Sequence, residues 1–247
     1  MSDRSRMMSI VDDPDRFSTQ LGGSFCDTST GWDAAVDEFI ATREHMRSIG
    51  IPVSNDDQDA GWYVPFLWWA RKHSMMPTSL TDIGCGLSTP SWAFHLSGSP
   101  HQLMIDFTDV GFASPPTGRN ISMNILDLGA IRNSNIWTHM GGMMVCTEVL
   151  EHLQFNPVPP FLLMTEMVDP DFIYISTSPF LNRDTMVDWH HYSTMPLYRG
   201  QRMFTSGWHY KGWSLDELCD FVVDIGFHVD SYFAGLRRLG IVGRRIR

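Results

Sequence analysis

The feature of this 247-residue chain that most constrains its fold is the alternation of short apolar runs with helix-length segments after Pro77. Short apolar runs bounded by turn residues are typical of buried strands, and helices between such strands are typical of parallel sheets. The pattern therefore predicts an α/β fold with a doubly wound, mostly parallel sheet and helices on both faces. The predicted strands are Ser79–Ile83, Gln102–Ile105, Ile121–Ile125, Met143–Cys146 and Phe172–Thr177.

The segments on either side of this pattern predict helices and a final hairpin. Trp32–Arg47 has apolar positions at helical spacing, and the aromatic segment Ala60–Ser74 predicts a helix whose rings pack in the core or wall a pocket. Near the C-terminus, Ser214 and Glu217 form the pattern of a capping box for a helix that ends at Ile225. Two further runs predict an antiparallel hairpin that completes a seven-stranded sheet, and they are Phe227–Phe233 and Gly240–Ile246.

Charge and cysteine content restrict the class of protein. The net charge of −10 argues against a broad surface for nucleic acid or anionic membranes. No run approaches the roughly 18 apolar residues that span a bilayer, and the four cysteines are too far apart for a C-x-x-C metal site. We therefore expect a cytoplasmic protein with reduced thiols and no secretory signal.

The arginines near the C-terminus predict a solvated edge of the protein. They are Arg237, Arg238, Arg244, Arg245 and Arg247.

The segment Asp82-Ile83-Gly84-Cys85-Gly86 places a carboxylate at a strand end, just before a Gly-x-Gly turn. The glycines let the backbone turn sharply and approach a ligand, while the carboxylate binds a cationic amine or organises the loop. A diphosphate would be repelled there, which counts against a nicotinamide dehydrogenase.

Asp106 ends the second run, close to the spacing after Asp82 of about 20 residues at which an acid reaches a ribose hydroxyl. Asp127 follows the third run, where a carboxylate can accept a hydrogen bond from an adenine amine. The three acids predict one adenosine-sized crevice at the carboxyl edge of the sheet.

On these residues the sequence resembles the class I S-adenosylmethionine-dependent methyltransferases, and within them the ubiquinone-biosynthesis-type group. Asp82–Gly86 looks like motif I of that family, while Val145–Leu153 and His209–Leu218 are similar to its signatures after the fourth strand and at the last helix. Ser88 departs from the pattern, because the family usually has a third glycine there. The resemblance implies a Rossmann-like fold and S-adenosyl-L-methionine as cofactor. It implies that the cofactor is bound by Asp82, Gly84, Cys85, Gly86, Asp106, Phe107, Leu126, Asp127, Thr147 and Glu148.

Methyl transfer to a hydroxyl requires a positioned nucleophile and the removal of its proton, so we expect a histidine base near the carboxyl edge. One histidine follows the fourth predicted strand and three lie in the long segment before the capped helix, namely His152, His190, His191 and His209. We take His152, His190 and His191 as the catalytic candidates. A metal site in the long segment would need Asp184 or Asp188 as a third ligand, and we expect no metal.

The predicted activity is methyl transfer to an oxygen, with nitrogen less favoured, of a small metabolite or glycan unit. The alternative is a degenerate methyltransferase fold that binds the cofactor as a partner subunit, which Ser88 keeps open. Asn156–Phe161 only looks like the Asn-Pro-Pro-aromatic motif of DNA methyltransferases, because it lies beyond the strand end and predicts a proline-rich helix boundary. The predicted units are a flexible arm (1–30) and one domain (31–247), divided into N-terminal helices (31–76), a cofactor-binding half (77–178), an insertion (179–213) and a C-terminal helix with hairpin (214–247).

Overall fold

The computed structural model describes most of the chain between the first predicted helix and the C-terminus. The described residues are 32–51, 53, 58–72, 78–86, 89–98, 101–106, 115–136, 142–177, 191–202, 209–235 and 238–247. The predicted arm, residues 1–30, lies outside them, as do Ser88, Phe107, Asp184, Asp188 and His190. None of the helices in the described part is long and apolar enough to cross a membrane.

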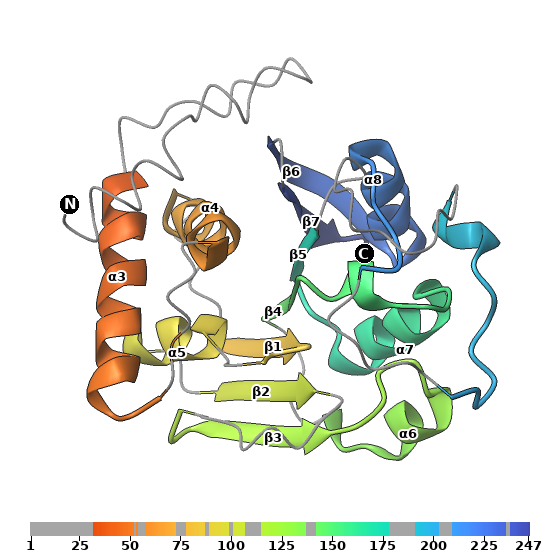
Figure 1. Ribbon diagram of the computed structural model, residues 1–247, viewed down its shortest axis with the longest axis horizontal. Helices are drawn as coiled ribbons and strands as arrows, with labels where there is room; N and C mark the ends of the chain where they lie inside the picture. The colour runs from red at the N-terminus through yellow and green to blue at the C-terminus, as the bar shows by residue number, and fades with distance from the viewer. Residues whose placement is uncertain are drawn as a thin grey trace.

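The strands form one seven-stranded sheet in the order β3-β2-β1-β4-β5-β7-β6 (Figure 1). The first five strands run parallel, and β7 is antiparallel to both β5 and β6. This arrangement confirms the predicted doubly wound sheet with a C-terminal antiparallel hairpin. The strands are β1 (Ser79–Ile83), β2 (His101–Asp106), β3 (Gly118–Ser122), β4 (Met143–Thr147), β5 (Phe172–Thr177), β6 (Phe227–Gly235) and β7 (Arg238–Arg245).

The third strand was predicted at Ile121–Ile125, and this prediction is wrong, because β3 begins and ends three residues earlier, at Gly118–Ser122. β3 is an edge strand with no fully buried residue, so hydrophobicity does not mark it. The amide of Met123 still bonds to the carbonyl of Asp106, after which the chain leaves the sheet. Ile125 and Leu126 are buried in the connection that follows. The apolar run therefore marks a packed connection rather than the strand.

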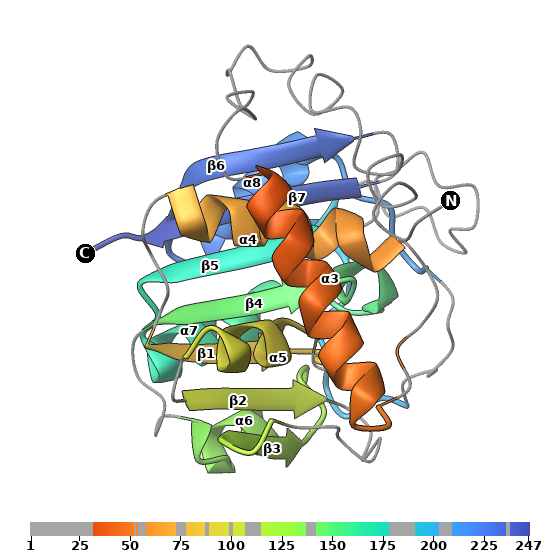
Figure 2. The same ribbon diagram turned by 90° about the vertical axis from the view of Figure 1, so that its left-hand side faces the viewer.

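Helices cover both faces of the sheet (Figure 2). The elements α3 (Trp32–Ser48), α4 (Gln58–Lys72) and α5 (Thr89–Leu96) lie on one face. The aromatic residues of α4 pack into the core on this side. Phe66 stacks on Tyr174 of β5 at 5.0 Å between ring centroids, and Trp69 contacts Phe172 at 5.4 Å. These rings therefore fill the interface between helix and sheet.

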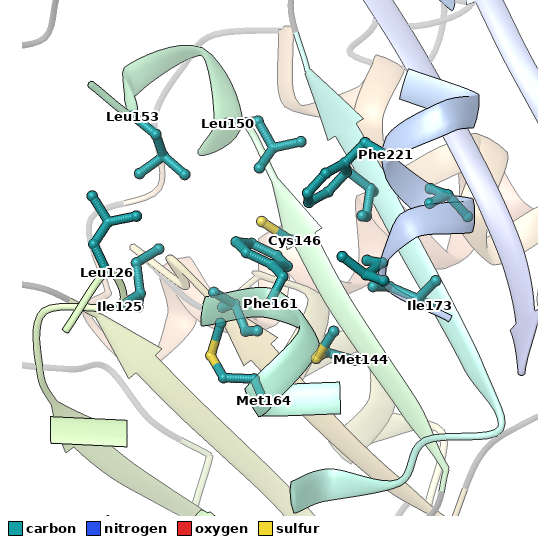
Figure 3. Close-up of a cluster of buried hydrophobic side chains, with 14 of the residues drawn as sticks. Ile125, Leu126, Met144, Cys146, Leu150, Leu153, Phe161, Met164, Ile173 and Phe221 are labelled. Atoms are coloured by element: carbon teal, nitrogen blue, oxygen red, sulfur yellow. The ribbon is translucent and has the colours of Figure 1, made fainter. Parts of the chain in front are cut away.

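The opposite face carries α6 (Leu128–Asn133), α7 (Val158–Val168) and α8 (Leu215–Asp224). Phe161 of α7 lies over Cys146 of β4 and meets Phe221 of α8 edge-on, with ring centroids 5.4 Å apart (Figure 3). Successive residues of β4 alternate between the two cores, because side chains of a strand point to opposite faces. The proline-rich boundary predicted before α7 is confirmed, since Pro157 is its N-cap residue.

The C-terminal helix begins as predicted, but its capping box is only half formed. The Ser214 hydroxyl accepts a hydrogen bond from the Glu217 amide at 3.1 Å. The Glu217 carboxylate does not return to Ser214 in any described hydrogen bond, because it is engaged by a buried lysine and by another loop.

Arg244 and Arg247 are exposed, as expected for a solvated edge, and both also form ion pairs, while Arg237 lies outside the described residues. Arg244 lies 3.0 Å from Asp230, and Arg247 pairs with Asp171. Arg244 is opposite the first residue of β5, so these pairs lie at the amino end of that strand.

Candidate functional site

The turn after β1 is joined to the end of β2 by hydrogen bonds from its backbone amides. The amide of Gly84 donates to the Ile105 carbonyl at 2.7 Å, and the amide of Gly86 donates to the Asp106 carboxylate at 2.9 Å. Gly84 has a φ of +68°, and a Cβ there would lie 2.2 Å from Cγ2 of Val149. Only glycine fits this position, because the conformation is left-handed and the segment after β4 packs directly against it.

Asp82 is buried near the end of β1, and its side chain contacts α5. The Ser91 hydroxyl donates to Asp82 at 3.3 Å. Burial raises the pKa of Asp82 to about 7; the Ser91 hydrogen bond lowers it and the nearby Asp106 carboxylate raises it further. Of the two roles considered for Asp82, this contact favours organisation of the loop.

Asp127 and Leu126 lie elsewhere than the sequence indicated. Asp127 is the N-cap residue of α6, and its Oδ1 accepts hydrogen bonds from the amides of Gly129 and Ala130 at 2.8 and 3.1 Å. Because β3 ends at Ser122, Asp127 does not stand directly at the strand end. The side chain of Leu126 is buried in the core, so only its backbone is available to a ligand. The Asp-x-Gly pattern is a capping signal that the sequence reasoning missed.

The segment after β4 carries the most unusual backbone of the site. Glu148 has a φ of +55°, a conformation that residues other than glycine adopt rarely, and its amide donates to the Ser176 carbonyl at 3.0 Å. Thr147 is buried at the end of β4. Such strained positions cluster at functional sites, because the surrounding structure must hold them in place.

The short helix η2 (Leu150–His152) brings Glu151 and His152 to this edge. Glu151 is fully buried, and its Oε2 accepts a hydrogen bond from the Thr177 hydroxyl at 2.8 Å. Its backbone carbonyl accepts from the amides of Tyr210 and Lys211 at 2.6 and 3.2 Å. Glu151 therefore fixes the segment before α8 against the ends of β4 and β5.

The histidines predicted as bases separate in the structure. His152 meets His209 edge-on with 4.9 Å between ring centroids, and Glu151 completes a group whose donor atoms lie within 4.8 Å of one another. His191 instead bonds to Ser193 at 2.8 Å within its own turn, and its Nε2 lies 4.0 Å from Asp220 of α8. His190 is outside the described residues. Glu151 was missed as a site residue, although it directly precedes His152.

A buried ion pair holds the segment that carries His209. Lys211 lies 2.7 Å from Glu217, and both side chains are almost completely buried. The same carboxylate oxygen accepts from the amide of Tyr192 at 2.6 Å. Lys211 also donates to the Gly212 carbonyl and lies over the ring of Trp213. Glu217 thus joins two loops to the start of α8.

Comparisons with known proteins identify the fold. No protein-family model matches the sequence, and no curated protein matches it. Among solved structures, a proposed RNA methyltransferase from Pyrococcus horikoshii superposes with a TM-score of 0.53 at 10% identity, covering 87% of this chain and 100% of that one. The 1,6-didemethyltoxoflavin-N1-methyltransferase of Burkholderia thailandensis, solved with S-adenosylhomocysteine, gives a TM-score of 0.50 at 13% identity, covering 87% and 89%. The chain has the Rossmann-like fold of methyltransferases. At this level of identity the likeness concerns the fold alone.

Proposed function

We propose that the chain is a cytoplasmic S-adenosyl-L-methionine-dependent methyltransferase that acts on an oxygen of a small metabolite or glycan unit, with nitrogen as the alternative acceptor. The observation that carries the proposal is the hydrogen bond from the Gly86 amide to the Asp106 carboxylate. It joins the ends of β1 and β2 at the carboxyl edge of the sheet, where ligands of such sheets bind.

The residues around this bond fit an adenosyl amino acid. A Cβ at Gly86 would meet no atom of the described residues within 4 Å, so these residues leave open space above the turn. Asp106 presents a carboxylate, whose several acceptor positions suit ribose hydroxyls beside the Gly86 amide. We assign to Thr147 and Glu148, at the end of β4, further contacts with the cofactor. When bound, the cofactor supplies a methyl group on a positively charged sulfur.

The remaining task of the protein is to position the acceptor and to remove its proton. We place the acceptor oxygen beside Glu151, His152 and His209, because these groups lie next to the strained backbone at Glu148. His152 would accept the proton of the acceptor hydroxyl, and the bound cofactor would supply the methyl group that the oxygen receives. We assign His191 a structural role and not a catalytic one, since its contacts are with its own turn and with α8.

Calorimetric titration with S-adenosylmethionine, S-adenosylhomocysteine and NAD tests the proposal. We expect micromolar binding of the two sulfur ligands and none of NAD, and loss of binding in Asp106→Ala. Asp171→Ala is the matched control, because it removes a carboxylate at the amino end of β5. Binding of NAD alone, or no binding of either sulfur ligand, would overturn the proposal. Binding without methyl transfer to any acceptor would favour the degenerate alternative.

A further inference from the structure

We propose that Glu151, His152 and His209 bind a divalent transition-metal ion at the carboxyl edge of the sheet. One donor atom from each of the three side chains lies within 4.8 Å of the others. Three ligand atoms that share one ion at about 2.1 Å lie no more than about 4.2 Å apart. The two imidazoles are only partly buried, so a small rotation of these rings closes the remaining distance.

The carboxylate of Glu151 gives an independent reason for a cation. Its Oε2 accepts the hydrogen bond from Thr177, whereas its Oε1 is buried and has no hydrogen-bond partner among the described residues. A buried carboxylate oxygen without a partner is costly, since it has lost its water and gained nothing in return. A metal ion at the cluster would satisfy it. The Thr177 hydroxyl would then orient the Glu151 carboxylate toward the ion through its hydrogen bond to Oε2.

The third ligand is held in place by the fold. The amides of Tyr210 and Lys211, directly after His209, both donate to the Glu151 carbonyl. The buried pair of Lys211 and Glu217 ties the same segment to α8. His209 therefore approaches Glu151 and His152 on a backbone that is already fixed, which lowers the entropy lost on binding an ion.

The chemistry of the three ligands indicates the class of metal. Imidazole nitrogens suit zinc and iron, while a carboxylate also suits manganese, so one carboxylate with two imidazoles favours Mn²⁺, Fe²⁺ or Zn²⁺ over Ca²⁺. Three protein ligands leave coordination positions open, as in catalytic metal sites.

The catalytic role of the ion rests on the proposed function: the ion would acidify an acceptor hydroxyl, whose proton goes to water. His152 would then be a metal ligand and not the base.

Titration of the chelator-treated full-length protein with MnCl₂ and ZnCl₂, and with MgCl₂ for comparison, tests the site. We expect one Mn²⁺ or Zn²⁺ ion per chain, with affinity at least about tenfold weaker in His152→Ala and in His209→Ala. His228→Ala removes an exposed histidine on β6 and serves as the control. Circular dichroism and thermal unfolding show whether each variant is folded. The proposal is overturned if no ion binds, or if the folded site variants bind it as tightly as the control.

The same samples separate this inference from the proposed function. Each is titrated with S-adenosylhomocysteine in the presence of chelator. If the sulfur ligand binds but no metal ion does, the metal site is wrong and the methyltransferase proposal stands. If the ion binds at the three side chains and the sulfur ligand does not, the metal site stands and the proposed function is wrong.

Discussion

The Gly86 amide donates a hydrogen bond of 2.9 Å to the Asp106 carboxylate, and this contact fixes the loop after β1 to the end of β2. The two residues come from different strands, which meet because β1 and β2 are parallel neighbours. One carboxylate thus organises the glycine turn and stands at the edge where a ribose would bind. The shape of the loop and the proposed contact with the ribose therefore depend on the same carboxylate.

The two glycines of the turn should respond differently to the same substitution. In Gly84→Ala the new Cβ would lie 2.2 Å from Val149, whereas in Gly86→Ala it would meet none of the described atoms within 4 Å. Both have positive φ, so the backbone strain is similar. We expect Gly84→Ala to cost about 1–3 kcal/mol more in the free energy of unfolding, measured by urea denaturation. Equal losses would contradict the close contact, and Val149→Ala should rescue part of the Gly84→Ala loss.

The buried pair of Lys211 and Glu217 should be sensitive to the loss of one partner. Lys211→Met leaves a buried carboxylate with only the Tyr192 amide as its described donor, so we expect a loss of about 3–5 kcal/mol in the free energy of unfolding. The double variant Lys211→Met/Glu217→Gln should recover part of it, because glutamine is uncharged and still accepts from Tyr192. Urea denaturation of the single and double variants measures both. A cost below about 1 kcal/mol for Lys211→Met would show that the pair contributes little.

The raised pKa of Asp82 predicts a pH dependence of stability. With a pKa of about 7 in the folded protein against 3.8 as the ordinary value, Asp82 holds its proton more tightly in the folded state. The stability contributed by the protonated carboxyl is therefore fully present below about pH 4 and is lost as the pH rises toward 7. Unfolding of wild type and Asp82→Asn between pH 4 and 8 measures it. We expect the fall in stability with rising pH to be smaller in Asp82→Asn, by on the order of a few kcal/mol over this window. Parallel curves for the two proteins would contradict the raised pKa.

Asp127 offers a way to separate capping from ligand binding. Asp127→Ala removes the acceptor for two amides at the start of α6 and should cost about 1 kcal/mol of stability. Asp127→Ser keeps an N-cap hydroxyl, so its stability should stay near that of wild type. If the carboxylate also binds the adenine amine, both variants should lose affinity for S-adenosylhomocysteine in calorimetric titration. Wild-type affinity in the serine variant would limit Asp127 to the helix cap.

The sequence by itself determined the elements whose chemistry is local. The buried strands β1 and β5 were predicted to the residue, because each has β-forming residues between turn residues and, although both include polar side chains, every position is buried. The start of α8 at Ser214 followed from a side chain that caps its own helix. The Gly84–Gly86 turn and Asp106 were also recognisable, since the carboxyl ends of parallel neighbours must meet at one edge of the sheet.

Only the tertiary structure decided the features that depend on contacts between distant parts of the chain. The bounds of β3 were missed because an exposed edge strand leaves no hydrophobic signal, and its pairing with β2 defines it. The cluster of Glu151, His152 and His209 exists because Tyr210 and Lys211 bond to the Glu151 carbonyl, and no pattern in the sequence encodes that contact. Local sequence specifies backbone conformation and burial, whereas the position of one loop against another is set by the packing of the whole fold.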